Sequence, residues 1–233
     1  NGWRVPKMNN QRYNQMLKAI GMVIGIENLH SHMGRHTFAT YMLSKEEITM
    51  ANKLLECVPN YSEGRDMDKI EKILDNFRGK QDVKLLDYQM DPSHNRLVVT
   101  VIGEPVALKD AVVASYGTAV ELIDMTQHEG QHPRMGAVDV CPFIPCRNTT
   151  VAEADEIAKA VAKEVGEKFG IPCFLYEDSA SAPHRVNLAS IRKGQFEGMA
   201  EKMKDTEKWA PDFGPAEMHP TAGVTAIGAR MPL

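Results

Sequence analysis

The sequence predicts an α+β fold of the ferredoxin-like type, in which helices cover one face of a mixed or antiparallel sheet. From about residue 50, strand-like and helix-like patterns alternate in the order strand, helix, strand, strand, helix, strand. Two long helices in this region carry clear start signals. A different pattern, a short helical segment, precedes residue 50. We therefore expect two parts, residues 1–49 and residues 50–233.

The first strand is expected over residues 53–58, where Pro59 and Asn60 form a turn that ends it. Apolar residues then recur at spacings of three and four over residues 66–77. This spacing predicts an amphipathic helix, which Gly79 closes.

Two further strands are expected over residues 84–88 and 97–102, joined by a polar turn. A long helix follows over residues 105–122, since its first residue is a proline, which is favoured at that position. A strand over residues 138–144 completes the ferredoxin-like order.

The second long helix is expected over residues 151–169. Thr150 and Glu153 form a capping-box pattern at its start, and Gly170 provides a C-terminal cap. Another strand follows over residues 173–176.

Composition is that of a soluble enzyme. With 43% hydrophobic residues, 25% charged residues and a net charge of −4, the chain can bury a core and has no global bias toward nucleic acid or anionic membranes. No apolar run is long enough to span a bilayer and no signal peptide is evident, so a cytoplasmic location is expected. The cysteines lack a Cys-x-x-Cys spacing and read as buried thiols: Cys57, Cys141, Cys146 and Cys173.

Most of the recognisable chemistry lies in one loop. It places His128 and His132 four residues apart beside Arg134, with Gly130 and Gly136 in the same stretch. Because histidine titrates near neutral pH, it can take and return a proton, so a general base is one interpretation. An ordinary turn, whose histidines cap strand ends or contact water, fits this local pattern equally well.

Further motifs accompany this loop in a characteristic order. They are Leu54 to Arg65, His94-Asn95-Arg96, Leu122 to Met125, Asp139 to Pro145 and Trp209 to Pro215. Together with the loop they resemble glutamate formiminotransferase over about residues 50–233. The resemblance implies the N-terminal half of a two-part catalytic unit, in which folate lies in a groove between the halves. The second subdomain would then be a partner missing from this chain.

The resemblance also implies a reaction. A formimino group would pass from N-formimino-L-glutamate to tetrahydrofolate, a step of histidine degradation, with tetrahydrofolate as co-substrate. His132 matches the catalytic histidine of that family and would act as the acid–base group. Pro133 would restrict the backbone before it and help to hold its direction.

Neighbouring residues have supporting roles with open alternatives. Arg134 would hold a carboxylate of the donor or of the folate tail, or form a surface ion pair. Asn95 and Arg96 would bind substrate from the adjacent turn, although asparagine is also an ordinary turn former. His128 is expected to support His132 rather than act as a second base. Asp139 would orient a histidine or simply begin a strand.

The folate-contacting loop of the family matches the segment that begins with Gly214 and Pro215 and ends with Gly223. Between these ends His219 and Thr221 stand where apolar or aromatic residues are expected. Backbone contacts to folate are predicted, because glycines let the main chain approach a ligand closely. Composition alone favours a surface loop.

The first part of the chain resembles another family. Within about residues 1–44, His32 and Arg35 resemble the His-x-x-Arg region of tyrosine recombinases of the phage-integrase type, where such residues handle a phosphate. The nucleophilic tyrosine of that family does not follow. We therefore expect a non-functional fragment whose scattered basic residues give only weak, salt-sensitive DNA binding.

No metal is expected, because the histidines do not fall in a ligand spacing with cysteines or carboxylates. Two alternatives to an active transferase remain open. The chain could be a folate-binding or partner-binding half-site that is inactive without a second subdomain, or an inactive fusion fragment. A homodimer is compatible with the sequence, whereas membrane and nucleic-acid partners are not expected.

Overall fold

A computed structural model of the chain describes residues 53–231. These residues belong to one compact unit, Met50–Met231. The segment that resembles tyrosine recombinases, including His32 and Arg35, lies outside the described residues, so its predicted properties stay predictions.

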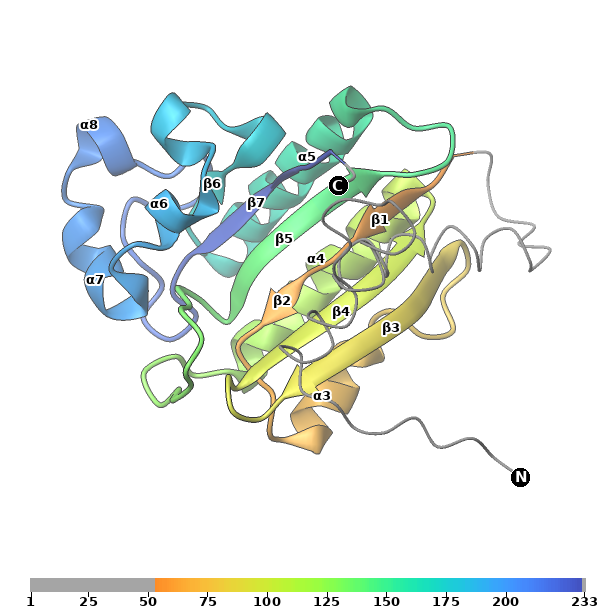
Figure 1. Cartoon of the computed structure of the whole chain (residues 1–233), viewed down its shortest axis with the longest axis horizontal. Helices are drawn as coiled ribbons and strands as arrows, with labels where there is room; N and C mark the ends of the chain where they lie inside the picture. The colour runs from red at the N-terminus through yellow and green to blue at the C-terminus, as the bar shows by residue number, and fades with distance from the viewer. Residues whose placement is uncertain (1–52, 232–233) are drawn as a thin grey trace, which may run out of the picture. The chain divides into compact units, whose positions relative to one another are not determined.

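A seven-stranded mixed sheet forms the centre of the described part of the chain (Figure 1). Its order is β3–β4–β1/β2–β5–β7–β6, with β1 and β2 both lying between β4 and β5. The strands are β1 (Leu55–Cys57), β2 (Asn60–Tyr61), β3 (Val83–Asp91), β4 (Arg96–Gly103), β5 (Val138–Pro145), β6 (Cys173–Leu175) and β7 (Thr225–Ala229).

The ferredoxin-like prediction is confirmed for the segment from β1 to β5. Helix α3 (Met67–Leu74) connects β2 to β3, and α4 (Pro105–Leu122) connects β4 to β5. The strands pair antiparallel in the order β3–β4–β1/β2–β5. Helix α5 (Val151–Phe169) then leads to β6, and β7 inserts parallel to both β5 and β6, which widens the sheet.

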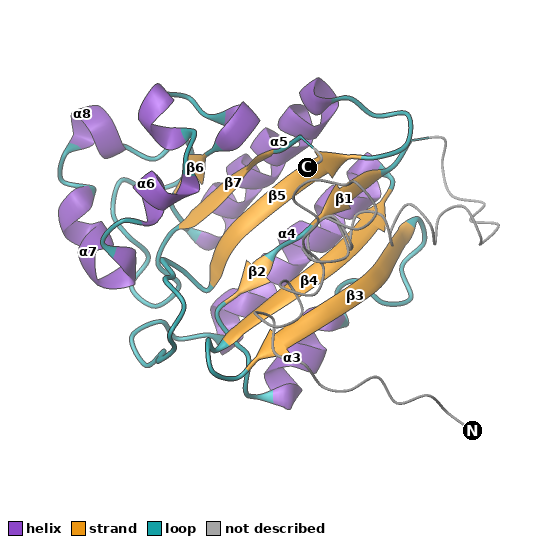
Figure 2. Ribbon diagram, in the orientation of Figure 1, coloured by secondary structure: helices purple, strands orange, loops and turns teal. Residues whose placement is uncertain are grey.

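Helices α3, α4 and α5 lie on the same face of the sheet, as predicted (Figure 2). Their starts follow the capping signals in the sequence, whereas α3 ends at Leu74 with Asp75 as its cap, before the predicted end at Phe77 and Gly79. The Asp66 side chain accepts from two backbone N–H groups at the start of α3, and Pro105 opens α4. Thr150 and Glu153 form the expected capping box, and Gly170 ends α5 in the left-handed conformation. The side-chain caps satisfy helix-end N–H groups that would otherwise lack partners, and the proline at the start of α4 has no N–H that needs one.

The core between helices and sheet is apolar, and two of its buried tyrosine hydroxyls are hydrogen-bonded. The Tyr61 hydroxyl lies 2.7 Å from Ser115 Oγ, and the Tyr116 hydroxyl lies 2.9 Å from Thr225 Oγ1. These bonds offset the desolvation of the hydroxyls and join α4 to β2 and β7. The cysteines are free thiols, three of them buried and Cys146 half-buried.

Two sequence predictions about strands were wrong. The first strand does not end in a turn at Pro59; the chain continues into β2, and proline only interrupts the ladder because it lacks an N–H. The register of β2 against β5 shifts between Asn60 and Tyr61. Strand β7 was not predicted, because Gly223 and Gly228 make its surroundings read as a loop. The tertiary pairing with β5 and β6 overrides that local signal.

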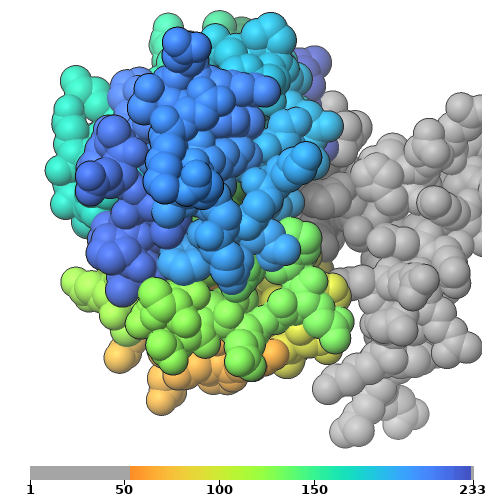
Figure 3. All heavy atoms as spheres, turned by 90° about the vertical axis from the view of Figure 1, so that its left-hand side faces the viewer, coloured from red at the N-terminus to blue at the C-terminus, as the bar shows by residue number. Residues whose placement is uncertain are grey.

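The segment between β6 and β7 carries short helices that the sequence analysis did not predict. They are α6 (Leu188–Arg192), α7 (Gln195–Lys202) and α8 (Thr206–Trp209). They lie at the β6 end of the sheet, and in the space-filling view their blue surface sits directly beside the green residues of the histidine-bearing loop (Figures 1 and 3). No described helix is both long and apolar enough to cross a membrane.

Candidate active site

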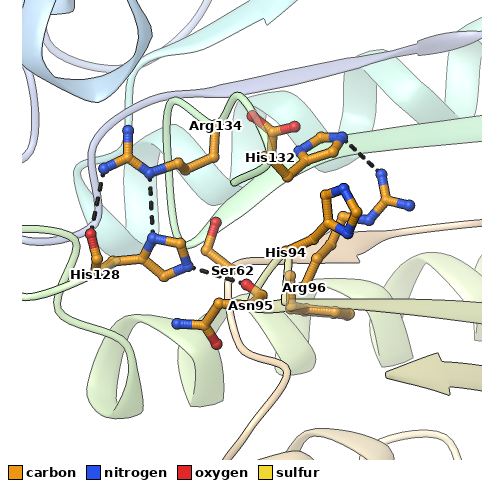
Figure 4. A pocket seen from close by; sticks show the side chains of 9 residues that line it. Ser62, His94, Asn95, Arg96, His128, His132 and Arg134 are labelled. Carbon is orange, nitrogen blue, oxygen red and sulfur yellow. Dashed lines mark hydrogen bonds between the residues drawn. The ribbon is translucent and has the colours of Figure 1, made fainter. Parts of the chain in front are cut away.

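Six residues singled out in the sequence converge on one small surface pocket (Figure 4). The pocket lies where the β3–β4 turn, the end of β2, the loop before β5 and the start of β5 meet. Its lining residues are Tyr61, Ser62, His94, Asn95, Arg96, His128, His132, Arg134 and Asp139. Ser62 and His94 were not among the predicted site residues.

Asn95 joins the β3–β4 turn to its neighbours. Its φ of 48° lies in the left-handed region, which asparagine tolerates better than most residues. Its Oδ1 accepts from the backbone N–H of Gly64 at 2.9 Å, and its Nδ2 donates to the carbonyl of Glu129 at 3.0 Å. Both side-chain polar groups are thus used by the protein, which agrees with the turn-forming role.

The histidine-bearing loop lies directly against this turn. Gln131 donates its backbone N–H to the carbonyl of Ser93 at 3.3 Å. A Cβ at Gly130 would overlap the carbonyl oxygen of His94, so a glycine is needed for this close approach. The approach brings His132 beside residues that are distant in the sequence.

His132 faces Arg96 across the pocket. Nη1 of Arg96 donates to Nε2 of His132 at 2.7 Å, so Nε2 carries the lone pair. Burial, followed by the positive charges of Arg96, Arg192 and His94, lowers the pKa of His132 to about 4, while the carbonyl of Pro133 opposes the shift. His132 is therefore neutral over the physiological range and retains an acceptor nitrogen.

His94 lies next to His132 but belongs to a different hydrogen-bond pair. Its ring centroid is 6.1 Å from that of His132, in an edge-to-face arrangement. Its Nδ1 lies 2.7 Å from Oδ2 of Asp91. Burial alone would raise the pKa of Asp91, but hydrogen bonds from His94 and Ser93 lower it below its ordinary value. The carboxylate thus orients His94.

The Arg134 guanidinium is fully hydrogen-bonded to other residues of the protein. It is 9% exposed. Nη1 and Nη2 form a two-pronged pair with Glu197 at 2.9 and 2.6 Å. Nη1 also donates to Gln195, Nη2 to the carbonyl of His128, and Nε to Nδ1 of His128. A guanidinium has five N–H donors, so all of them have protein partners here.

His128 supports the loop rather than facing Arg96. Since its Nδ1 accepts from Arg134, its Nε2 carries the proton and donates to the carbonyl of Asn95 at 3.0 Å. The imidazole therefore connects the histidine-bearing loop to the β3–β4 turn. Glu197, on α7, was not identified in the sequence analysis, because an exposed glutamate in a short helix carries no local signal.

Asp139 is buried at the start of β5 and carries two bonds. Its Oδ1 accepts from the backbone N–H of Met135 at 2.9 Å, and its Oδ2 accepts from Nη2 of Arg192 at 2.5 Å. Burial raises the pKa of Asp139, and these two donors and Arg96 oppose that shift. Asp139 thus orients the loop backbone and an arginine, not a histidine. Arg192, on α6, was also missed by the sequence analysis.

The converging residues lie in a segment with known relatives. Residues 54–230 match the formiminotransferase domain, N-terminal subdomain. The chain belongs to this family.

Curated relatives include glutamate formimidoyltransferases from Streptococcus pyogenes serotype M1 and Thermoplasma acidophilum. The first is 52% identical over 181 residues, covering 78% of this chain and 60% of the relative. The second is 46% identical over 179 residues, covering 76% and 58% respectively. The formimidoyltransferase-cyclodeaminase of Rattus norvegicus is 42% identical over 179 residues, covering 77% of this chain and 33% of the relative. The matched segment thus spans at most about three fifths of these relatives.

The segment that was expected to contact folate divides into two parts. Gly223, with a φ of 70°, pairs with Gly136 at the base of the histidine-bearing loop. Gly214 instead packs against Ile171 at the end of α5, and Pro215 is exposed. None of the three predicted residues Gly214, Pro215 and Gly223 lines the pocket.

The departure of His219 from the family pattern has a structural explanation. Its Nδ1 accepts from the backbone N–H of Ala222 at 2.9 Å, and its backbone pairs with Gly223. Burial lowers the pKa of His219, which favours the neutral ring that can accept this bond. The side chain closes a turn. Within residues 53–231 no group of three or more His, Cys, Asp or Glu side chains could hold a metal ion.

Proposed function

We propose that this chain supplies the N-terminal half of a glutamate formimidoyltransferase, with His132 as its acid–base group. The relatives that carry this name support the reaction. The observation that carries the proposal is geometric: His132 lines the pocket, and its Nε2 is an acceptor, 2.7 Å from Nη1 of Arg96. The lowered pKa of the ring agrees with this, because it keeps the imidazole neutral.

The proposed reaction moves a formimino group from N-formimino-L-glutamate to N5 of tetrahydrofolate. N5 attacks the amidine carbon, and a tetrahedral adduct forms. Nε2 of His132 takes the proton from N5 and then gives it to the glutamate nitrogen as the carbon–nitrogen bond breaks. The products are 5-formiminotetrahydrofolate and glutamate, and the imidazole returns to its neutral state.

Arg96 has a specific part in this scheme. Its guanidinium holds Nε2 of His132 in the absence of substrate. A carboxylate that draws Arg96 away would free Nε2 and, because a positive charge leaves the ring, would raise the pKa of His132. Arrival of an anionic donor therefore prepares the base for proton transfer.

The role of the second subdomain is part of the proposal. The relatives extend well beyond the matched segment, with 60% and 58% of their lengths covered. We infer that tetrahydrofolate lies between this chain and that second subdomain, with backbone contacts from the segment that ends at Gly223. Tetrahydrofolate is the co-substrate and no metal takes part. A place in histidine degradation, a cytoplasmic location and a homodimer stay predictions.

The test is a transfer assay on the purified chain with N-formimino-L-glutamate and tetrahydrofolate. It is run alone and with a separately expressed second subdomain taken from the Streptococcus pyogenes relative. Turnover in either sample supports the proposal, and turnover only after complementation identifies a split site. Tetrahydrofolate binding without turnover in both samples would contradict it and favour the half-site that only binds folate.

A further inference from the structure

Three arginines lie at the His132 pocket: Arg96 and Arg134 line it, and Arg192 bonds to the lining residue Asp139. They differ in how many of their N–H groups are hydrogen-bonded to the protein. All five donors of Arg134 bind protein acceptors. Arg96 is engaged with Nε2 of His132. Arg192 donates one hydrogen bond within residues 53–231, to Asp139, and its buried Nε has no acceptor there. Arg192 therefore has the spare donor capacity.

The fold places Arg192 against the pocket wall. It is the last residue of α6, and its partner Asp139 lines the pocket directly. Nζ of Lys202 donates to the carbonyls of Ser190 and Ile191 at 2.7 and 2.6 Å, which fixes the end of this short helix. The Arg192 side chain is 18% exposed, so it is sheltered yet open at one edge.

The charge balance at the wall favours an anion. Arg96 and Arg192 both act on the His132 ring, whereas Asp139 is the one carboxylate that lines the pocket. A carboxylate ligand would accept the unused donors of Arg192 and neutralise the excess positive charge. Guanidinium is suited to this because its donors match the two carboxylate oxygens.

We propose that Arg192 binds a carboxylate of the amino-acid donor, a task for which the sequence analysis considered Arg134 as one of several interpretations. This inference rests on the proposed function and adds a specificity-determining residue to it. The ligand class is an N-substituted dicarboxylic amino acid. Arg134 is a positioning residue, because its donors hold His128 and α7 in place and leave none for substrate.

Binding to the full chain tests the inference without requiring turnover. The probes are N-formimino-L-glutamate and its two mono-amides, in which either the α- or the γ-carboxylate is neutral. Titrations are followed by NMR with and without tetrahydrofolate, for wild type and Arg192→Met. Arg78→Met is the matched control. Arg78 forms ion pairs with Glu71, on α3, and with Asp75, the residue that follows α3, and none of these residues lines the pocket.

The expected result is a roughly 10- to 100-fold weaker binding of the donor to Arg192→Met and no change in Arg78→Met. One of the two mono-amides lacks the charge that Arg192 would bind. It should bind wild type about as weakly as N-formimino-L-glutamate binds Arg192→Met, and its own affinity should fall little further in Arg192→Met. Such non-additivity identifies the carboxylate that Arg192 contacts, which a merely structural role would not produce. Arg192→Lys should recover part of the affinity.

Three outcomes would overturn the inference. The first is that folded Arg192→Met binds N-formimino-L-glutamate as tightly as wild type does. The second is that the substitution weakens binding of N-formimino-L-glutamate and of both mono-amides by the same factor. The third is that wild type does not bind N-formimino-L-glutamate, either with or without tetrahydrofolate. If Arg192→Met does not fold, Arg192→Lys is judged by the same criteria. Donor binding that depends on Arg192, in a sample that never transfers the group, would leave the inference standing and reject the proposed function. Transfer with an unchanged KM in Arg192→Met would do the reverse.

Discussion

Nη1 of Arg96 lies 2.7 Å from Nε2 of His132, so a cation holds the one imidazole nitrogen that is free to accept a proton. The two residues come from different parts of the chain, Arg96 from the first position of β4 and His132 from the loop before β5. Burial and the charge of Arg96 both lower the pKa of His132 and keep the ring neutral, and the contact also occupies its lone pair. In the proposed mechanism, His132 can therefore accept a proton only when Arg96 is drawn elsewhere.

Removal of the Arg96 charge should raise the pKa of His132 above its value of about 4. The ring would gain stability in its protonated form, because the nearest positive charge is lost, while burial would still hold the pKa below its ordinary value. NMR titration of the His132 Cε1 proton in Arg96→Met measures this. Arg78→Met serves as control, and an unchanged pKa in Arg96→Met would contradict the account.

The lowered pKa of His132 also predicts a pH-dependent contribution to stability. The pKa falls from 6.5 to about 4 on folding, so the unfolded chain binds more protons at pH values between these two. The contribution is fully present above pH 6.5 and is lost as the pH falls through about 4.

Urea unfolding of wild type and His132→Asn at pH 7, 5.5 and 4.5 measures this contribution. As the pH falls, the unfolding free energy of wild type should decrease more than that of His132→Asn, because only wild type carries the titrating ring. A difference independent of pH would show that the folded-state pKa of His132 is not lowered.

Gly130→Ala should impair catalysis more than stability. The new Cβ would overlap the carbonyl oxygen of His94 and push the histidine-bearing loop away from the β3–β4 turn. A displacement of this kind should lower kcat/KM by roughly 10- to 100-fold. Gly198→Ala is the matched control, because no atom lies within 4 Å of its added Cβ inside α7. Equal kcat/KM values for the two variants would contradict the close approach.

The Arg134–Glu197 pair should show an asymmetric effect on stability. Arg134→Met removes five hydrogen bonds from a buried position and should lower the unfolding free energy by about 2–4 kcal/mol. The Glu197 side chain is 63% exposed, so Glu197→Gln should cost less than about 1 kcal/mol. The bond from Arg134 lowers the pKa of Glu197, which keeps the pair ionised near neutral pH.

Thermal and urea unfolding of both variants measure that asymmetry. A similar loss in each would show that Arg134 depends on Glu197 alone and not on the contacts with His128 and Gln195.

The sequence predicts those parts of the fold whose signals are local. The capping box of Thr150 and Glu153 and the proline that opens α4 mark their helices to the residue. Strand β7 and helices α6–α8 depend on pairing and packing with residues far away in the chain. Such elements have little signal of their own, so local patterns could not reveal them.

The residues of the site that stand in local motifs were also predictable, whereas those on the unpredicted helices were not. His132 and its neighbours stand in a recognisable motif, and the strand order brings them to one pocket. Arg192 and Glu197 reach the pocket wall from the unpredicted helices. The role of Arg134 could not be read from its residue type, because two of its three partner residues, Gln195 and Glu197, lie about 60 positions away.

The measurement that tests the account most directly is single-turnover formimino transfer by wild type and His132→Asn, each with the second subdomain added. If His132 is the acid–base group, the rate should be about 100- to 10,000-fold lower in the variant, with the affinities for N-formimino-L-glutamate and tetrahydrofolate nearly unchanged. His184→Asn, a substitution outside the pocket, should transfer at the wild-type rate. A His132→Asn rate within a few-fold of wild type would contradict the assignment of His132 as the acid–base group.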